Sequence, residues 1–226
     1  CKFGGFKIRR FYFLKPLLYL QTFLFLIIGC SHKTLYDSSF YCKKFNIECT
    51  KKNKRVVFKT SKGNFEVKLY GEKKPVTVSN FIQNVKKNIY KNKKFYKIIN
   101  YPQVQLIYSG IYPKNKYYTK ENQNLNKPIR NIPLEIKLNK ETQPRYGYQI
   151  VNPSEIVNLT NLFEKGSLAM VKSGERDSSS TEFFFVTNKL SELDGRYSIF
   201  GKVVKGIEIL QKIDKEDLIV EIIISN

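Results

Sequence analysis

Side chains that commonly perform acid–base or metal chemistry are scarce in this chain of 226 residues. The sequence contains a single histidine, His32, which lies near the N-terminus rather than in the later part of the chain. A Ser/His/Asp triad, a histidine-ligated zinc centre or a histidine general base is therefore not expected in the folded domain. We expect no metal and no cofactor, and any reaction must proceed without an imidazole.

Two of the four cysteines form an even pair in a polar stretch. Cys42 and Cys49 have six residues between them, and in an oxidising compartment such a pair could close a small loop as a disulfide. The alternative is that both remain free thiols. The sequence offers no second cysteine pair that would complete a zinc site.

Residues 1–29 have the layout of a secretion signal. An apolar stretch over residues 17–28 follows a basic region that contains no acidic residue. The basic residues are Lys2, Lys7, Arg9, Arg10 and Lys15. Twelve helical residues rise about 18 Å, less than the roughly 30 Å hydrocarbon core of a bilayer, which favours a signal over a permanent spanning helix.

The signal ends in Ile27-Ile28-Gly29-Cys30, which resembles a bacterial lipobox. The resemblance implies a signal peptide over 1–29 and lipidation of Cys30, which would become the first residue of the mature protein. The alternative is an uncleaved signal anchor in which Cys30 is unmodified. Either interpretation predicts an exported, membrane-anchored protein on the periplasmic or equivalent lumenal side.

The composition indicates a globular fold with an excess of positive charge. Hydrophobic residues make up 42% of the chain, which excludes wholesale disorder and a collagen-like fibre. Forty Lys and Arg against nineteen Asp and Glu give a net charge of +21. The basic residues are dispersed and form no arginine-rich cluster interleaved with aromatics, so no nucleic-acid partner is expected.

Residues 30–55 are polar, lysine-dotted and without sustained periodicity, which predicts a tether. The folded domain is expected over residues 56–226. It opens with a hairpin, because residues 56–60 and 65–70 read as strands on either side of a turn that contains Gly63. Residues 76–90 then repeat apolar side chains at helical spacing.

The rest of the chain alternates short strand-like runs with long polar segments. The predicted strands lie at 94–99, 104–108, 132–136, 167–171, 182–187, 199–204 and 218–224. A second helix is predicted from Gly206, and segments 114–127 and 139–161 are predicted to be long loops. About eight strands with two helices predict a mainly β protein, a closed eight-stranded antiparallel β-barrel capped by two α-helices.

Four blocks of this sequence resemble cyclophilin-type peptidyl-prolyl cis-trans isomerases, in the family's order. They are Phe95-Tyr96-Lys97-Ile98-Ile99, Gly166-Ser167-Leu168-Ala169-Met170, Thr181-Glu182-Phe183-Phe184-Phe185-Val186 and Leu193-Asp194-Gly195-Arg196-Tyr197-Ser198-Ile199-Phe200-Gly201. The resemblance covers residues 56–224 and implies the family's eight-stranded barrel with two capping helices. It also implies an enzyme that turns X-Pro amide bonds, with proline-containing polypeptides as substrates.

The resemblance places Lys97 where the family has a catalytic arginine. An ammonium keeps the positive charge but loses the planar fork of donors, so the activity is expected to be weakened. The family's groove glutamine is replaced by Glu182. Its catalytic-site glutamine corresponds to Gln105 in an ungapped count, or to Tyr108 if residues 100–110 contain an insertion, and the sequence leaves both alternatives open.

The same resemblance implies the substrate-binding residues. Phe184 and Leu193 match the proline pocket, and Val171 and Lys172 match residues that line the peptide groove. Tyr197 replaces the family's pocket histidine, and Glu192 replaces a tryptophan present in many members. These replacements motivate an alternative function, a catalytically degenerate cyclophilin-like domain that serves as a peptide-binding or assembly module.

Overall fold

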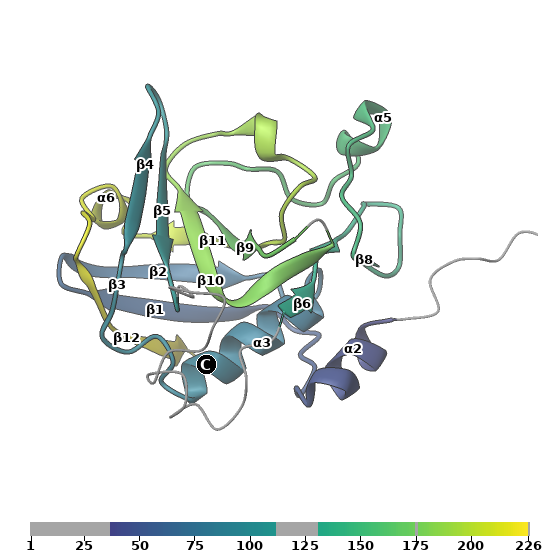
Figure 1. Ribbon diagram of the computed structural model, residues 1–226, viewed down its shortest axis with the longest axis horizontal. Coiled ribbons are helices and arrows are strands. Elements are labelled where there is room, and N and C mark those ends of the chain that lie inside the picture. The colour runs from purple at the N-terminus through teal and green to yellow at the C-terminus, as the bar shows by residue number, and fades with distance from the viewer. Residues whose placement is uncertain (1–36, 112–130, 175, 226) are drawn as a thin grey trace, which may run out of the picture. The chain divides into compact units, whose positions relative to one another are not determined.

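The computed structural model describes residues 37–111, 131–174 and 176–225 (Figure 1). The strands are β1 (Lys54–Thr60), β2 (Gly63–Leu69), β3 (Lys93–Lys94), β4 (Lys97–Asn100), β5 (Gln105–Ser109), β6 (Asn131–Pro133), β7 (Glu135–Ile136), β8 (Arg145–Tyr146), β9 (Ser167–Lys172), β10 (Asp177–Val186), β11 (Ile199–Lys205) and β12 (Leu218–Ser225). The helices are α2 (Ser38–Phe45), α3 (Pro75–Lys86), α5 (Pro153–Ile156), the single 3₁₀ turn η1 (Ser191–Leu193) and α6 (Ile207–Leu210).

One antiparallel sheet organises the domain. Its strands follow the order β3-β12-β1-β2-β11-β9-β10-β5-β4, and β6 pairs with β10 beside this path. Strands β7 and β8 form a separate two-stranded sheet. The predicted hairpin is confirmed as β1 and β2, in which Val56 pairs with Val67 and Phe58 pairs with Phe65.

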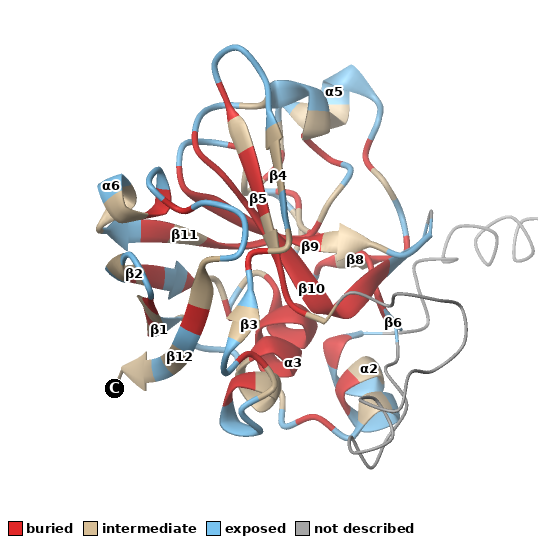
Figure 2. Ribbon diagram, turned by 60° about the vertical axis from the view of Figure 1, so that its left-hand side comes forward, coloured by how far each residue is buried: buried red, intermediate tan, exposed pale blue. Residues whose placement is uncertain are grey.

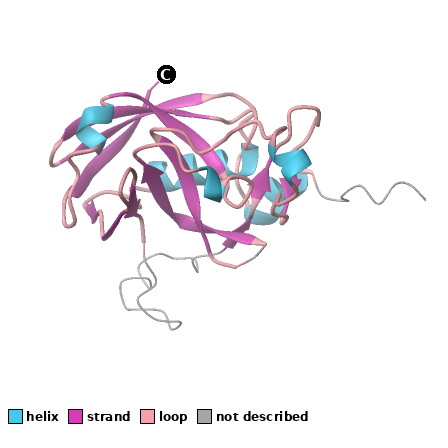
Figure 3. Cartoon of the chain, turned by 90° about the horizontal axis from the view of Figure 1, so that it is seen from above, coloured by secondary structure: helices cyan, strands magenta, loops and turns pink. Residues whose placement is uncertain are grey.

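The mainly β fold is confirmed as a curled half-barrel, and the structure does not demonstrate the predicted closure into an eight-stranded barrel. The strands at the two ends of the path, β3 and β4, are separated in the chain only by Phe95 and Tyr96, so the sheet must curl. Figure 3 shows the strands curving past one another rather than lying flat. This segment pairs through β3 with β12 and through β4 with β5, and the backbone N–H of Phe95 extends the first pairing by donating to the Asp217 carbonyl.

The main core fills the concave side of the sheet and is rich in aromatic rings. Its largest buried members include Phe58, Phe65, Phe183 and Phe185, all with at most 2% of their surface exposed. Helix α3 packs Phe81 into this cluster and is the most completely buried helix in Figure 2. The predicted helical period over 76–90 is therefore confirmed for most of its length, although α3 ends at Lys86.

The start of α3 is capped from another part of the chain. Pro75 occupies the first turn, and no side chain of the preceding segment caps the helix. The fully buried carboxylate of Glu135 instead accepts hydrogen bonds from the N–H groups of Val76 (3.2 Å) and Thr77 (2.8 Å) and from the Tyr146 hydroxyl (3.0 Å). A carboxylate at this end satisfies otherwise unpaired donors and interacts favourably with the helix dipole.

The segment interpreted as a tether contains folded structure. Asp37 caps α2, and Cys42 of that helix is buried against Val76 and Tyr146. Cys42 and Cys49 form a disulfide with a Cα–Cα distance of 5.7 Å. The prediction of a polar tether up to residue 55 is therefore corrected over 38–45. This helix buries only Ser38 and Cys42 and is held by a disulfide, so its sequence shows no sustained apolar period.

Two other expectations also change. The predicted helix after Gly206 is a single turn, α6, and the segment 139–161 contains β8 and α5 rather than only loop. The predicted signal peptide, the lipobox with Cys30 and the loop 114–127 lie outside the described residues. In the part of the chain that the structure describes, no helix is long and apolar enough to cross a membrane.

Candidate active site

Strand β10 separates two apolar clusters by the alternation of its side chains. Phe183 and Phe185 point into the main core, whereas Phe184 points to the other face and joins a smaller cluster. Successive side chains of a strand must point to opposite faces of the sheet. One run of three phenylalanines therefore contributes both to the core and to the candidate site.

Aromatic rings surround Phe184. The Tyr108 ring stacks on it at a centroid distance of 5.2 Å, the Phe163 ring stacks at 5.8 Å, and the Tyr197 ring meets it edge-on at 5.2 Å. Only 1% of Phe184 is exposed. Phe184 is thus the buried base of the cluster, and the half-buried rings of Tyr108 and Tyr197 form the walls that face solvent.

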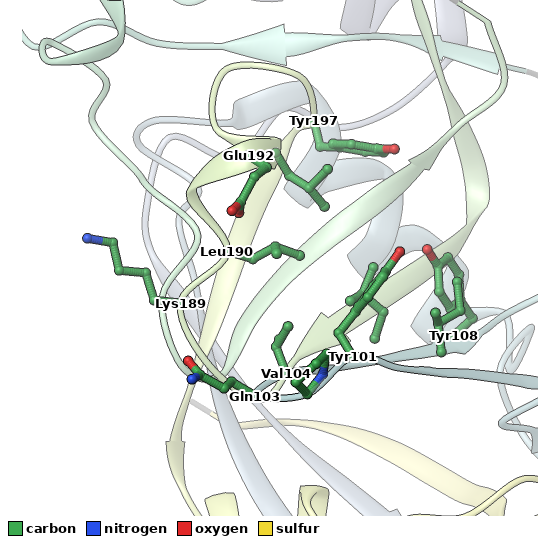
Figure 4. A pocket seen from close by; sticks show the side chains of 12 residues that line it. Tyr101, Gln103, Val104, Tyr108, Lys189, Leu190, Glu192 and Tyr197 are labelled. Carbon is green, nitrogen blue, oxygen red and sulfur yellow. The ribbon is translucent and has the colours of Figure 1, made fainter.

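A cavity of about 610 Å³ opens at these walls (Figure 4). It is lined by Ile99, Tyr101, Pro102, Gln103, Val104, Leu106, Tyr108, Lys189, Leu190, Glu192, Leu193 and Tyr197. Its volume falls within the range of about 300–1,000 Å³ that is usual for small-ligand pockets. Of the predicted pocket residues, Leu193 and Tyr197 line the cavity directly, whereas Phe184 lies behind Tyr108 and Tyr197.

The predicted catalytic cation lies beside this cavity. Strand β4 pairs with β5 so that Lys97 stands opposite Tyr108. The Lys97 Nζ is 5.3 Å from the centroid of the Tyr108 ring, within the range of a cation–π contact. Lys97 is exposed and forms no ion pair with any described carboxylate, Glu182 and Glu192 included.

The structure distinguishes between the two candidates for the family's catalytic-site glutamine. Tyr108 pairs with Lys97 and lines the cavity, whereas Gln105 lies three positions earlier in β5 and points to the opposite face. The Gln105 Nε2 donates to Asn100 Oδ1 at 3.0 Å and lines a separate polar cavity. The structure therefore brings Tyr108 to the candidate site and places Gln105, predicted as a catalytic residue, outside it.

A bulge in β10 positions the residue before Phe183. The pairing of β10 with β9 shifts between Ser178 and Phe183, and two side chains of α3, Asn80 and Asn84, donate to the carbonyl of the buried bulge residue Ser180 at 2.6 and 2.7 Å. Gly110 permits the close approach of β5, because a Cβ there would lie 2.4 Å from the Thr181 carbonyl oxygen. The helix and the neighbouring strand together fix where Glu182 lies.

Glu182 is 7% exposed, and its carboxylate accepts a hydrogen bond from the Tyr96 hydroxyl at 2.7 Å. Burial raises the pKa of Glu182, and the hydrogen bond from Tyr96 lowers it in part. The carboxylate is therefore engaged by Tyr96 and not by Lys97. The predicted catalytic role of Glu182 is not supported by a direct contact with the cation.

The remaining predicted groove residues, Val171 and Lys172, both reach the cluster around Phe184. Val171 packs against the Phe184 cluster, and the Lys172 Nζ is 6.0 Å from the centroid of the Tyr197 ring. Both side chains belong to β9, which pairs with β10. Strand β9 thus places a second ammonium next to the second aromatic wall.

Three tyrosine hydroxyls gather around the cavity. Burial, with smaller contributions from Tyr197 and Tyr101, raises the pKa of Tyr108 to about 12. Burial also raises the pKa of Tyr197. Figure 4 shows all three tyrosines on one side of the cavity, with Lys189 and Glu192 directed outward on the other side. These neutral hydroxyls can donate hydrogen bonds to the backbone carbonyls of a bound peptide.

Sequence reasoning missed several of these residues. Tyr101 belongs to the irregular segment after Ile99, Tyr96 is predicted only as part of a strand, and Phe163 lies between the predicted loop 139–161 and the predicted strand 167–171. No local pattern marks any of them, since their roles depend on contacts between distant segments. The described residues include no cluster of three or more His, Cys, Asp or Glu side chains that could hold a metal ion.

Comparison with known proteins agrees with this fold. The family model described as cyclophilin type peptidyl-prolyl cis-trans isomerase/CLD matches residues 55–223. A peptidyl-prolyl cis-trans isomerase of Acinetobacter baylyi is 31% identical over 167 residues, which cover 71% of this chain and 72% of that protein.

Solved structures show the same fold. A cyclophilin-type peptidyl-prolyl cis-trans isomerase of Cryptosporidium parvum superposes with a TM-score of 0.53 at 22% identity, covering 77% of this chain and 99% of that one. A structure of that protein in the presence of the dipeptide Ala-Pro gives a TM-score of 0.51 at 22% identity and covers 76% and 99% of the two chains.

The fold and the site thus define a cyclophilin-like domain, a curled antiparallel sheet with an aromatic cavity on one face. The extent of the family match and the identity to the Acinetobacter protein establish the family. This chain belongs to the cyclophilin-type peptidyl-prolyl cis-trans isomerases, a family of enzymes.

Proposed function

We propose that this protein is a peptidyl-prolyl cis-trans isomerase that acts on X-Pro bonds of exported proteins, with Lys97 as its catalytic cation. The observation that carries the proposal is the position of the Lys97 ammonium, 5.3 Å from the ring of Tyr108, which is itself a wall of the cavity. The Ala-Pro dipeptide present with the Cryptosporidium protein supports proline-containing peptides as the substrate class.

The reaction requires no bond to be broken. Turning an amide bond costs about 18–20 kcal/mol, because the twisted state loses the resonance between nitrogen and carbonyl. A donor that hydrogen-bonds the prolyl nitrogen stabilises this state selectively, since the nitrogen becomes a better acceptor only when resonance is lost. Lys97 would supply that donor, while the cavity holds the proline ring and the tyrosine hydroxyls hold the flanking backbone.

A lysine performs this role less well than an arginine. Its ammonium is a strongly hydrated point charge on a flexible stem, whereas a guanidinium presents donors in a rigid plane. The cation–π contact with Tyr108 restricts the ammonium but leaves it exposed to solvent. We therefore expect isomerisation that is measurable and slower than in relatives with an arginine at this position.

The activity can be tested directly by NMR exchange spectroscopy on an Ala-Pro peptide with the full chain added. We expect the cis and trans signals to exchange faster than the uncatalysed rate, which corresponds to tens to hundreds of seconds. Lys97→Gln should remove most of this acceleration, by about 10²-fold if the ammonium acts as a single transition-state donor. Exchange equal to that of a buffer blank would reject the proposal.

We also propose export with a lipid anchor on Cys30. The support is the sequence of residues 1–29, the lipobox-like Ile27-Ile28-Gly29-Cys30, and the Cys42–Cys49 disulfide, a bond that persists in oxidising compartments. Metabolic labelling with a fatty-acid analogue should mark the wild-type protein and not Cys30→Ala. Equal labelling of both would contradict the anchor.

A second function is supported by a specific observation. Tyr108 and Phe163 stack on Phe184, so the aromatic base of the expected proline pocket is covered by the protein's own side chains. A catalytically degenerate module would still bind proline-containing peptides in the cavity. Peptide binding detected by NMR chemical-shift changes, together with an exchange rate equal to the blank, would favour this module over the enzyme.

A further inference from the structure

Two ammonium groups flank the candidate site through the same type of contact. The Lys97 Nζ lies 5.3 Å from the Tyr108 ring centroid, and the Lys172 Nζ lies 6.0 Å from the Tyr197 ring centroid. Tyr108 and Tyr197 both contact Phe184 at 5.2 Å and both line the cavity. The two cations are therefore held on two different walls of one cavity, one by β4 and the other by β9.

Lys97 and Lys172 lack the carboxylate partners that several basic side chains of the sheet have. On the sheet, Lys59 pairs with Glu221, and Arg55 pairs with Glu66. Lys202 pairs with Glu164. Neither Lys97 nor Lys172 forms an ion pair with any described residue. No ion pair within the described part of the chain therefore neutralises these two ammonium groups.

The nearest carboxylates do not cancel this charge. Glu182 is almost fully buried, and its carboxylate accepts a hydrogen bond from the Tyr96 hydroxyl rather than pairing with a lysine at the mouth of the cavity. Glu192 lines the cavity but shares its outer edge with a third lysine, Lys189, and both point outward in Figure 4. The rim thus carries three lysines and one exposed carboxylate.

We propose that this site selects X-Pro segments that carry an acidic residue next to the proline, with Lys172 as the group that binds the carboxylate while Lys97 serves the prolyl nitrogen. The inference deepens the proposed isomerase function and rests on it for the catalytic readout. A carboxylate on the flank of the bound proline that faces Lys172 meets an ammonium that forms no ion pair with a described residue. A lysine on that flank meets a like charge, which is unfavourable.

The preference can be measured with a matched series of tetrapeptides that contain one Ala-Pro or X-Pro bond. The residue before the proline is Glu, Gln or Lys, and a second series varies the residue after it in the same way. With the full chain, we expect kcat/KM from NMR exchange to be about two- to fivefold higher for Glu than for Gln, the range that one partly exposed ion pair supports. Raising the salt concentration to about 1 M should remove most of this difference, because the Debye length falls to about 3 Å.

Charge-reversal variants separate a local effect from the net charge of +21. Lys172→Glu should invert the preference on one flank, so that the Lys peptide becomes better than the Glu peptide. Lys86→Glu changes the net charge by the same amount at an exposed position of α3, and it should leave the Glu preference unchanged. A variant that inverts a preference reports a gained property, which misfolding cannot imitate.

The inference and the proposed function fail in different ways. Turnover that is equal for the Glu, Gln and Lys peptides would overturn the charge preference and leave the isomerase intact. Turnover absent for every peptide would overturn the isomerase, and the dissociation constants of the same peptides, measured by NMR titration, would then decide the preference. Equal dissociation constants, or an equal loss of preference in Lys172→Glu and Lys86→Glu, would also overturn it.

Discussion

Phe184 and Phe185 are neighbours on β10, and both are almost completely buried, yet their surroundings differ. Phe185 meets other phenylalanines at 5.5–5.8 Å, namely Phe58, Phe65 and Phe183. Phe184 meets two tyrosines as well as Phe163, and these tyrosines in turn carry ammonium groups. One face of the strand packs against apolar rings, and the other face packs against tyrosines whose rings contact lysine ammonium groups.

The comparison teaches how a small sheet can separate stability from function. The core face gains its stability from apolar burial and from close packing in which every ring has apolar neighbours. The site face keeps its aromatic base but places groups at the walls that can exchange water for a peptide. Because alternation in the strand enforces this division, a substitution at one position should affect mainly one property.

The largest effect is expected on the core face. Phe185→Ala should lower the free energy of unfolding by about 3–5 kcal/mol, since it removes a fully buried ring from a packed aromatic cluster. Urea unfolding followed by circular dichroism measures this loss. As a control, Phe185→Leu retains most of the volume and should lose less than about 1.5 kcal/mol. A loss of less than about 2 kcal/mol for Phe185→Ala would contradict the placement of this ring in a closely packed core.

The next largest effect is expected from Phe184→Ala. The ring supports both Tyr108 and Tyr197, so its removal should let the cavity walls collapse. If about 1.5–3 kcal/mol of apolar contact is lost from the bound state, kcat/KM falls roughly 10- to 100-fold. The exchange assay measures this fall in kcat/KM, and the same assay on Phe185→Ala shows whether the core face affects activity as strongly as the site face. An unchanged kcat/KM would show that the cavity does not depend on its aromatic base.

A smaller effect, an increase in activity, is expected at Lys97, which lies beside the Tyr108 wall. Lys97→Arg should raise kcat/KM by about tenfold, equivalent to one further hydrogen bond of about 1.4 kcal/mol in the twisted state. Urea unfolding should be nearly unchanged, because residue 97 is exposed. The exchange assay on Ala-Pro measures the gain. No gain in a variant that still binds peptide would favour the non-catalytic module.

The division between the faces could be predicted only in part from the sequence. The alternation of Phe65 and Val67 in β2 and the helical period of α3 are local signals, and both elements formed as predicted. The resemblance located Lys97, Leu193 and Tyr197 near one site because it carried information about distant segments. The curl of the sheet was overstated as a closed barrel, since closure depends on hydrogen bonds that leave no mark in the sequence.

The sequence-based predictions that missed or misplaced site residues have a common physical cause. Gln105 was counted into the site because residues 100–104 change the length of the β4–β5 connection, and a shift of one residue moves a side chain to the other face. Tyr96 and Glu135 make their key hydrogen bonds to residues 86 and 59 positions away in sequence. Such partners follow from the fold as a whole and not from a local pattern.

The smallest effect is expected from Glu182→Gln, at the end of the bulge that leads to Phe184. Burial raises the pKa of Glu182, so the folded state binds its proton more tightly than the unfolded state does. Between the ordinary value of 4.5 and the raised value, the folded state therefore binds more protons, and this group's contribution to stability falls as the pH rises. Glu182→Gln removes the titration while keeping an acceptor for the Tyr96 hydroxyl. Urea unfolding at a series of pH values from 4 upward should show a shallower decline for the variant, and identical pH profiles for both proteins would mean that Glu182 titrates as an ordinary surface carboxylate.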